Sequence, residues 1–148
     1  SCVHRDLPSF PTRRSSDLSE SGVRPQFALG FRNRSRILGH DEFKELGPVY
    51  ISTEDGSEGH RGFVTDIPAF RDEAWDRIYC CGPEPMMKAV AAACRRRDIF
   101  REVSLENLMA CGLGICLCCV VPTTSGNLCS CTDGPVFNIN DLKWQTSG

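Results

Sequence analysis

Six of the ten cysteines in this chain lie between residues 111 and 131. Four of them follow the spacing C-x4-C-x2-C-x11-C, and these are Cys111, Cys116, Cys119 and Cys131. Four thiolates from one short segment can surround a 2Fe–2S cluster, with two sulfurs on each iron. Gly112 and Gly114 fall in the first gap, where the backbone must curl close around inorganic sulfide and a β-carbon would clash. The spacing therefore predicts an iron–sulfur centre.

A structural zinc site is the competing interpretation of these cysteines. Zinc sites typically offer paired C-x2-C knuckles, whereas this segment has a lone C-x2-C preceded by a four-residue gap. The first three spacings are instead those of plant-type ferredoxin loops. Cys118 lies beside Cys119, and we favour Cys119 as the ligand because it preserves the C-x4-C-x2-C spacing.

Composition narrows the setting in which such a centre would work. With 148 residues and 41% hydrophobic content, the chain can bury one modest core, or a partial domain with a small appendage. The net charge of −2 gives no indication of a nucleic-acid partner. Clustered cysteines without a recognisable signal peptide favour a reducing cytoplasm over a secreted disulfide scaffold. The apolar run Ala89–Cys94 is too short to cross a bilayer, so no membrane association is expected.

Residues His4 to Leu18 look foreign to the rest of the chain. They resemble the conceptual translation of a common sequencing-library adapter and match it at every position except Pro8. The segment is dominated by Pro, Ser and Arg, and neither strand nor helix periodicity runs through it. We therefore expect residues 1–18 to be non-native and disordered, and we exclude Cys2 and His4 from the functional argument. A natural basic arm is the alternative.

From residue 19 onward the chain alternates strand and helix patterns. Short apolar runs bounded by Gly, Pro or polar turns predict strands, and amphipathic or Ala-rich runs predict helices. The strands are expected at Gln26–Phe31, Val49–Ser52, Arg77–Cys81 and Phe100–Val103, and the helices at Asp41–Leu46 and Met86–Arg97. This alternation predicts an α/β fold with a parallel sheet, in which ligands bind at the carboxyl ends of the strands.

Three polar loops follow the predicted strands and share that edge: Arg32–Ser35, Thr53–Ser57 and Cys81–Pro85. The chain contains no G-x-G-x-x-G sequence, so no phosphate fingerprint supports a nucleotide site. Each loop taken alone is ordinary turn chemistry. Their common edge makes ligand binding a competing interpretation.

Two stretches of the chain resemble a known family. Tyr79–Lys88 resembles the C-G-P-x-P-M-M signature in the nucleotide domain of the ferredoxin–NADP reductase superfamily. Val103–Cys119, followed by Cys131–Phe137, resembles one branch of that superfamily, the electron-transfer subunit of the NAD-dependent (class 1B) dihydroorotate dehydrogenase. Cys131 is preferred to Cys129 as the fourth ligand because it begins the C-x-D-G-P-V-F match.

The resemblance implies a redox role that uses several cofactors. In this family electrons pass from an FMN in a catalytic partner subunit through a 2Fe–2S cluster to FAD, and then to NAD as hydride. The resemblance implies a heterotetramer with that dihydroorotate dehydrogenase catalytic subunit, acting in pyrimidine biosynthesis. Cys81, Gly82 and Pro83 match the motif whose cysteine lies beside the nicotinamide ring, and the four spaced cysteines match the cluster ligands.

The chain also departs from the pattern of this family. The FAD-binding barrel is missing, as are the first strand, the Gly-rich turn and the first helix of the nucleotide domain. The resemblance therefore implies a subunit truncated at its N-terminus, with a partial NAD-binding domain at residues 19–103 and a 2Fe–2S domain at residues 104–148. It places the absent strand between Gln26–Phe31 and Arg77–Cys81. A cluster carries single electrons and a flavin must pair them into a hydride, so this chain alone is expected to be inactive.

Two alternative functions stay open. Related flavin oxidoreductases, of the NADPH-dependent reduced-ferredoxin or sulfide dehydrogenase type, tend to carry an aspartate where this chain has Cys111. They also tend to carry D-G-P-E-F where it has Asp133–Phe137. The alternative from another class is a zinc-binding interaction module without enzymatic activity. The sequence leaves open the choice between NAD and NADP and the roles of Cys118 and Cys129.

Overall fold

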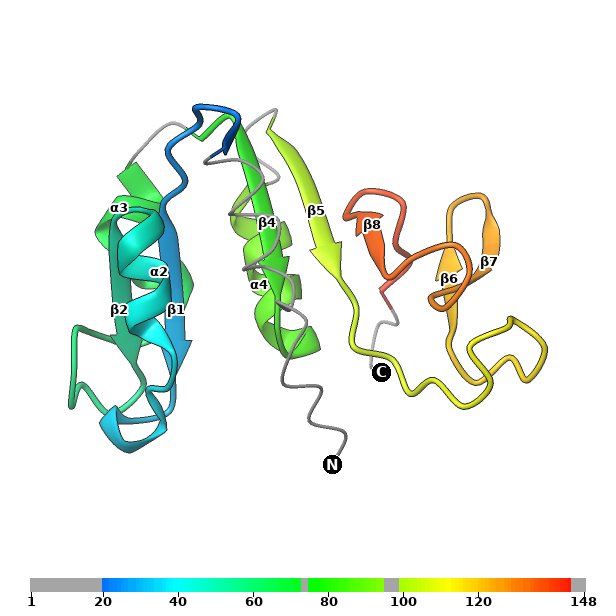
Figure 1. Cartoon of the computed structure of the whole chain (residues 1–148), viewed down its shortest axis with the longest axis horizontal. Coiled ribbons are helices and arrows are strands. Elements are labelled where there is room, and N and C mark those ends of the chain that lie inside the picture. The colour runs from blue at the N-terminus through cyan, green and yellow to red at the C-terminus, as the bar shows by residue number, and fades with distance from the viewer. Residues whose placement is uncertain (1–19, 73–74, 95–98, 145–148) are drawn as a thin grey trace. The chain divides into compact units, whose positions relative to one another are not determined.

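The computed structural model describes residues 20–72, 75–94 and 99–144, and the N-terminal segment 1–18 lies outside the described residues. The chain forms two compact units, residues 1–74 and 75–148 (Figure 1). The predicted domain boundary between residues 103 and 104 falls inside the second unit and stays a prediction. Within the described ranges, no helix is both long enough and apolar enough to cross a membrane.

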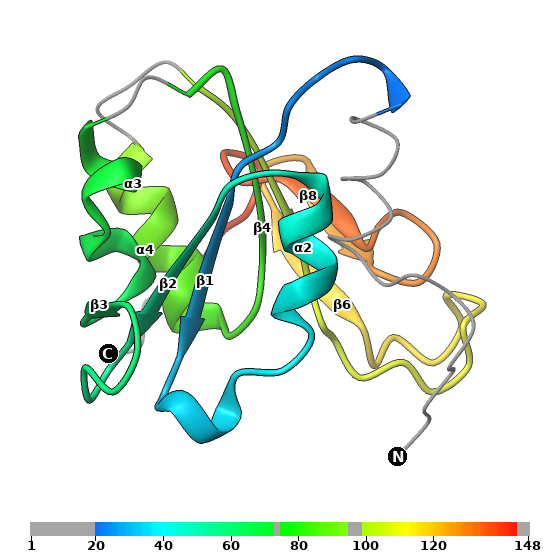
Figure 2. The same cartoon turned by 60° about the vertical axis from the view of Figure 1, so that its left-hand side comes forward.

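A three-stranded parallel sheet organises the first unit. Strands β1 (Phe27–Phe31), β2 (Val49–Thr53) and β3 (His60–Arg61) lie in that order. The helices of this unit are α2 (His40–Leu46), α3 (Pro68–Asp72) and two short 3-10 helices at Arg34–Arg36 and Val64–Asp66. Figure 2 shows α2 on one side of β1 and β2 and α3 on the other. Both faces of the sheet are therefore covered, as is usual for parallel strands.

Apolar contacts attach these elements to the two faces of β1. The ring of Phe27 packs against that of Phe43 in α2, with the ring centroids 5.0 Å apart. Side chains alternate along a strand, so Gly30 faces the opposite side from Phe27. There Val64 lies 3.6 Å from the position that a Gly30 β-carbon would occupy. Phe27 and Val64 are both buried.

The second unit begins with a mixed sheet. Strands β4 (Arg77–Cys81) and β5 (Phe100–Ser104) are parallel, and β8 (Val136–Asn138) pairs antiparallel with β5. Helix α4 (Glu84–Cys94) follows β4 and places four side chains in the core: Met87, Val90, Ala91 and Cys94. Val103 in β5 is completely buried. The core of this unit therefore lies between α4 and the central strand of the sheet.

A β-hairpin completes the second unit. Strands β6 (Val120–Thr123) and β7 (Gly126–Cys129) pair antiparallel. Thr123 also forms a bridge with Leu142, and the N–H of Lys143 donates to the carbonyl of Pro122 at 2.9 Å. The end of the described chain is therefore anchored beside the hairpin.

The structure confirms the predicted α/β class and the parallel pairing. Each of the four predicted strands is present, with ends that differ by at most one residue from those expected. Helix α4 begins at Glu84, two residues earlier than predicted. Its predicted end at Arg97 lies outside the described residues. The sequence analysis did not predict β3, α3, β6, β7 or β8.

Among the described strands, β1 has β2 as its ladder partner and β4 has β5. The family resemblance predicts a further strand between β1 and β4, and that expectation stays a prediction.

Candidate iron–sulfur centre and the adjoining nucleotide motif

The cysteine-rich segment between β5 and β6 curls tightly because several of its residues have a left-handed backbone conformation. Gly112 has a φ of 69° and Gly114 a φ of 75°, a region that glycine enters without steric cost. Leu117, between Cys116 and Cys118, has a φ of 57°, which is uncommon for a residue with a β-carbon. The segment therefore departs from regular structure where its ligand candidates cluster.

Cys111 and Cys116 form the first pair of thiols. The N–H groups of Cys116 and Leu113, followed by the Cys116 thiol, hydrogen-bond the Cys111 sulfur and lower its pKa to about 6. The Leu113 nitrogen lies 3.3 Å from Cys111 Sγ. Hydrogen bonds to sulfur favour the thiolate, which is the form that binds metal. The local backbone thus prepares Cys111 for ligation.

Cys119 and Cys131 form the second pair. The N–H of Cys131, and then its thiol, hydrogen-bond the Cys119 sulfur and lower the pKa of Cys119. The same thiol contact, together with burial, raises the pKa of Cys131, whereas the N–H of Gly114 acts in the opposite direction. The negative charges of Cys119 and Cys111 both act on Cys131. The second pair therefore lies within electrostatic reach of the first.

A tight turn presents Cys131. The N–H of Cys129 donates to Asp133 Oδ2 at 2.7 Å. In return, the N–H groups of Thr132 and Asp133 donate to the Cys129 carbonyl at 3.1 and 2.8 Å. A β-carbon on Gly114 would stand 3.2 Å from the Thr132 methyl group. The left-handed loop and the Cys131 turn are thus packed directly against each other.

The arrangement of thiols in pairs fits a 2Fe–2S cluster better than a single metal ion. Such a cluster needs two sulfurs on each of two irons, whereas a structural zinc ion needs four ligands around one point. The assignment of Cys111, Cys116, Cys119 and Cys131 as ligands stays a prediction that this pairing supports.

Cys118 and Cys129 differ from these four in their surroundings. Cys118 is exposed, its thiol donates to the Cys116 carbonyl at 3.8 Å, and its hydrogen bond with Cys116 raises its pKa. Burial, followed by the charges of Cys119 and Asp133, raises the pKa of Cys129. The pKa of Cys131 is raised as well, so the preference for Cys119 and Cys131 as ligands rests on the sequence spacing and the C-x-D-G-P-V-F match.

The nucleotide motif lies at the carboxyl end of β4. The carbonyl of Pro83 accepts the N–H groups of Met86 and Met87 at 2.9 and 3.1 Å, which opens α4. Gly82 has a φ of 148°, and a β-carbon there would reach within 2.5 Å of the Met86 terminal methyl. Glycine is thus required where β4 turns into the helix.

Cys81, the cysteine of this motif, is held as a thiol. Its Sγ donates to Glu106 Oε1 at 3.6 Å. Burial, and then the charge and hydrogen bond of Glu106, raise the pKa of Cys81 to about 11. At neutral pH the Cys81 side chain is therefore a thiol that can donate a hydrogen bond, and not a thiolate.

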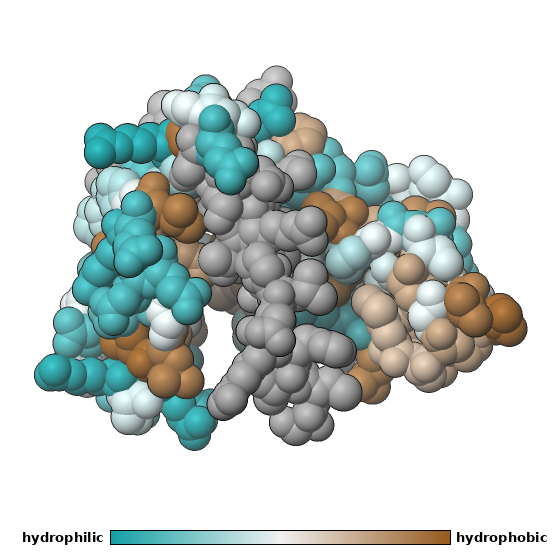
Figure 3. Space-filling model, in the orientation of Figure 1, coloured by the Kyte–Doolittle hydropathy of each residue, from teal (hydrophilic) through white to brown (hydrophobic). Residues whose placement is uncertain are grey.

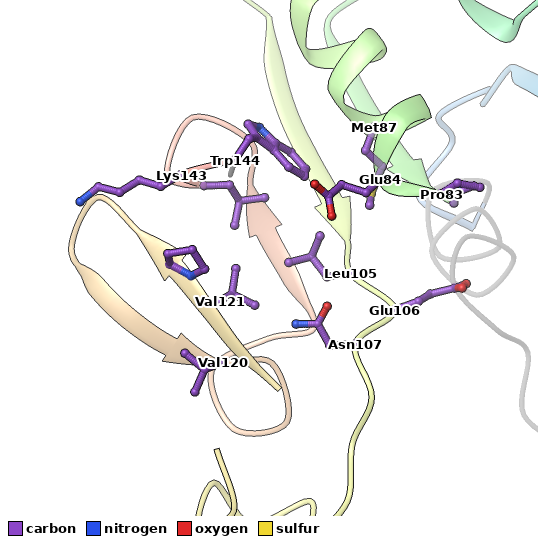
Figure 4. A pocket seen from close by; sticks show the side chains of 13 residues that line it. Pro83, Glu84, Met87, Leu105, Glu106, Asn107, Val120, Val121, Lys143 and Trp144 are labelled. Atoms are coloured by element: carbon purple, nitrogen blue, oxygen red, sulfur yellow. The ribbon is translucent and has the colours of Figure 1, made fainter. Parts of the chain in front are cut away.

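Cys81 and the second thiol pair are joined by two consecutive residues, Glu106 and Asn107. Figure 4 shows their side chains pointing in opposite directions beside a cavity of about 350 Å³. The cavity walls come from the start of α4, the segment after β5, strand β6 and the end of the described chain. They include Pro83, Met87, Leu105, Val121, Leu142 and Trp144. The sequence analysis did not single out Glu106 or Asn107, although both follow a parallel strand at its ligand edge.

Trp144 is tied to α4 through charged side chains. The Lys88 ammonium pairs with Glu84 at 2.7 Å and lies 5.9 Å from the centroid of the Trp144 ring. A cation near an aromatic ring is attracted by the ring's quadrupole. This contact closes one side of the cavity.

The two polar loops that follow β1 and β2 in the first unit contact each other. The N–H of Arg34 donates to Ser57 Oγ at 2.8 Å, and the Arg34 guanidinium lies 3.7 Å from Glu58. The loops after β1 and β2 therefore meet, as their common edge predicted. The third predicted loop, Cys81–Pro85, belongs to the second unit.

Comparison with known proteins gives a consistent result. Residues 106–143 match the model of the iron–sulfur cluster binding domain of dihydroorotate dehydrogenase B. The chain is 42% identical over 129 residues to the electron transfer subunit of dihydroorotate dehydrogenase B (NAD(+)) from Shouchella clausii, covering 84% of this chain and 49% of that protein. The corresponding subunit from Clostridium perfringens is 40% identical over 132 residues, covering 88% of this chain and 52% of that protein.

A solved structure shares the fold. It is that of the NADH-dependent reduced ferredoxin–NADP oxidoreductase, a protein of flavin-based electron bifurcation. The TM-score is 0.78 at 32% identity, over 88% of this chain and 48% of the other. The chain thus spans about half the length of the relatives it matches. Residues 106–143 are thus similar to the iron–sulfur cluster binding domain of dihydroorotate dehydrogenase B, and the chain as a whole is similar to about half of that enzyme's electron transfer subunit.

Proposed function

We propose that this chain is the cluster-bearing part of a dihydroorotate dehydrogenase B electron transfer subunit. The observation that carries the proposal is the arrangement of thiols in two pairs, Cys111 with Cys116 and Cys119 with Cys131. These pairs lie in the segment that matches the iron–sulfur domain of that enzyme. A 2Fe–2S cluster bound there would supply one-electron transfer, and FAD and NAD would supply electron pairing and the hydride acceptor.

The chain's own residues bind and orient the cofactors in this proposal. The N–H groups of Leu113 and Cys116 favour the Cys111 thiolate, while the turn closed by Asp133 presents Cys131. At the other site, the Cys81–Gly82–Pro83 turn would lie against the nicotinamide, with Cys81 retaining its proton at neutral pH. We propose that the centre works in a reducing cytoplasm, as the clustering of its cysteines predicts.

The exposed face of the cluster loop supports a protein partner. Leu113, Ile115 and Leu117 lie between the ligand candidates and are 70%, 77% and 63% exposed. Figure 3 shows hydrophobic side chains gathered over the part of the second unit that carries this loop. Large apolar side chains concentrated at one exposed place are typical of a protein interface. We propose that the loop docks on an FMN-containing dihydroorotate dehydrogenase catalytic subunit, within a heterotetramer that oxidises dihydroorotate and reduces NAD in pyrimidine biosynthesis.

Anaerobic reconstitution of the chain with iron and sulfide tests the cluster part of this proposal. Cys116→Ser should abolish or strongly perturb the visible cluster absorption, because it removes one thiolate of the first pair. Cys118→Ser is the matched control at the neighbouring exposed thiol and should leave the spectrum near normal. A second pair of variants tests the ligand in the turn at residues 129–133. Cys131→Ser should lose the cluster, and Cys129→Ser should retain it. The reverse pattern in either pair would show that the ligand assignment is wrong.

A bifurcating reductase of the reduced ferredoxin–NADP type is the second candidate, since one such protein shares the fold. Cys111 argues against it, because those relatives tend to carry aspartate at that position. Full-length protein that reduces NADP with reduced ferredoxin, and that fails with dihydroorotate and its catalytic subunit, would favour this alternative.

A further inference from the structure

One side-chain amide connects the two backbone segments that carry the second thiol pair. Asn107 Nδ2 donates to the carbonyl of Cys119 at 3.4 Å and to Ser130 Oγ at 3.1 Å. Cys119 is the residue before β6, and Ser130 immediately precedes Cys131. Asn107 therefore contacts the main chain of one ligand candidate and the neighbour of the other.

The acceptors of these hydrogen bonds are buried, so water cannot replace Asn107 without rearrangement. Ser130 is completely buried and Cys119 is 2% exposed. The Cys119 carbonyl also accepts the N–H of Ser130 at 3.0 Å. The amide thus adds a second donor to a carbonyl that already joins the two segments. Leaving a buried hydroxyl without its partner is unfavourable.

Asn107 is itself placed by rigid structure. It lies three residues after β5 ends at Ser104, and the N–H of Leu105 donates to the Pro135 carbonyl at 3.0 Å. In Figure 4 the side chain of Asn107 points toward the side of the cavity formed by β6. Its position is therefore set by β5 and by the hydrogen bond from Leu105 to Pro135.

We propose that Asn107 is a positioning residue of the centre, whose side-chain amide holds Cys119 and Cys131 at the separation that one iron atom requires. This inference rests on the proposed function, because it assumes that the two thiols share an iron. Residues that orient metal ligands through hydrogen bonds typically change metal affinity or activity by about 10–100-fold when they are replaced. Asn107 is assigned this role for the second pair, while the loop's own N–H groups serve the first.

The test uses the 148-residue chain, reconstituted anaerobically with ferrous iron and sulfide. Asn107→Ala removes both hydrogen bonds, and Asn107→Asp keeps the size of the side chain but replaces the donor by an oxygen that repels the Cys119 carbonyl. Both variants should lose the cluster to an iron chelator about tenfold faster or more than the unaltered chain. They should also change the visible circular dichroism and the electron paramagnetic resonance line shape of the cluster that remains.

Asn127→Ala is the matched control, because Asn127 is an exposed asparagine in β7, in the hairpin between Cys119 and Ser130. It should leave both the chelation rate and the spectra unchanged. A role in folding alone would lower the yield of loaded chain in the Asn107 variants while the remaining cluster kept the original line shape, and that outcome would overturn the inference. If the Asn107 variants aggregate, Ser130→Ala removes one acceptor alone, and an unchanged spectrum and chelation rate in that variant would overturn it equally.

The two levels of the proposal fail in different ways. An unaltered chain that takes up no iron and sulfide would contradict the proposed function itself. An unaltered chain that loads normally, with Asn107 variants indistinguishable from it, would contradict the positioning role alone.

Discussion

The cysteine-rich region and the parallel strands differ in how far along the sequence their hydrogen-bond partners lie. Every hydrogen bond that shapes the thiol pairs arises within residues 107–133, from neighbouring N–H groups, the Asp133 carboxylate and the Asn107 amide. The parallel strands depend on neighbours distant in sequence, and β1 and β4 each have one ladder partner in the part of the chain described by the structure. The contacts around the thiols therefore come mainly from one stretch of sequence, with β5 placing Asn107, whereas the ladders of the parallel strands join distant segments.

The largest expected effect concerns the strand that the family resemblance predicts beside β1 and β4. A buried amide without its partner costs about 1–3 kcal/mol, and several of these would rival the roughly 5–15 kcal/mol of stability that a whole domain has. We therefore expect amides in β1 of the 148-residue chain to exchange hydrogen quickly, and its thermal transition to be broad. Amides of the β6–β7 hairpin should be protected once the cluster is reconstituted. A sharp cooperative melt of the whole chain, together with tight NAD binding, would contradict the predicted difference in stability between the parallel strands and the cysteine-rich region.

A smaller effect is expected at the two left-handed glycines of the cluster loop. A residue with a β-carbon in this conformation costs about 1–2 kcal/mol, so Gly112→Ala and Gly114→Ala should both slow cluster assembly. Nothing lies within 4 Å of a β-carbon on Gly112, whereas one on Gly114 would meet the Thr132 methyl at 3.2 Å. Gly114→Ala should therefore be the more damaging change, measured as the yield of loaded cluster. Equal yields would mean that the loop and the Cys131 turn do not constrain each other.

The smallest effect is the pH dependence of Cys81. Its pKa of about 11 lies above the ordinary value of 9.0, with burial as the larger cause and Glu106 as the next. The rate of alkylation by iodoacetamide should therefore rise through a midpoint near pH 11. Glu106→Gln should move that midpoint down, though not to the ordinary value, because burial persists. A midpoint near 9 in the unaltered chain would contradict the Cys81–Glu106 contact.

The raised pKa of Cys81 also makes the free energy of unfolding depend on pH. The folded state holds the Cys81 proton more tightly than the unfolded chain does, so its contribution is fully present below the ordinary pKa. That contribution is lost as the pH rises from about 9 through about 11. Glu106→Gln should reduce this loss, as measured by the free energy of unfolding across that range.

How far the sequence could predict this structure depended on the kind of signal each segment carries. The apolar runs at β1, β2, β4 and β5 are bounded by Gly, Pro or polar turns, which is why they were predicted to within a residue. Strand β3 is only His60–Arg61 and has no apolar alternation to detect. Strands β6, β7 and β8 were missed because the residues of that region were interpreted as cluster ligands and turns, not as paired strands.

The candidate site likewise contains residues that the sequence predicts and residues that it does not. The cysteine spacing pointed to Cys111, Cys116 and Cys119, and the C-x-D-G-P-V-F resemblance added Cys131, but the sequence did not predict which thiols lie together. Asn107 acts through its position after β5 and through contacts with Cys119 and Ser130, which lie 12 and 23 residues further along the chain. No local pattern encodes those contacts. Residues that support a site through tertiary hydrogen bonds become visible only once the fold is known.

The central claim is that the thiols between Cys111 and Cys131 hold a 2Fe–2S cluster. It is tested most directly by chemical analysis of the anaerobically reconstituted chain for iron and acid-labile sulfide, combined with electron paramagnetic resonance of the reduced sample. We predict about two irons and two sulfides per chain and the signal of a one-electron-reduced 2Fe–2S centre. A colourless chain that binds one zinc ion, contains no sulfide and gives no such signal would contradict the account.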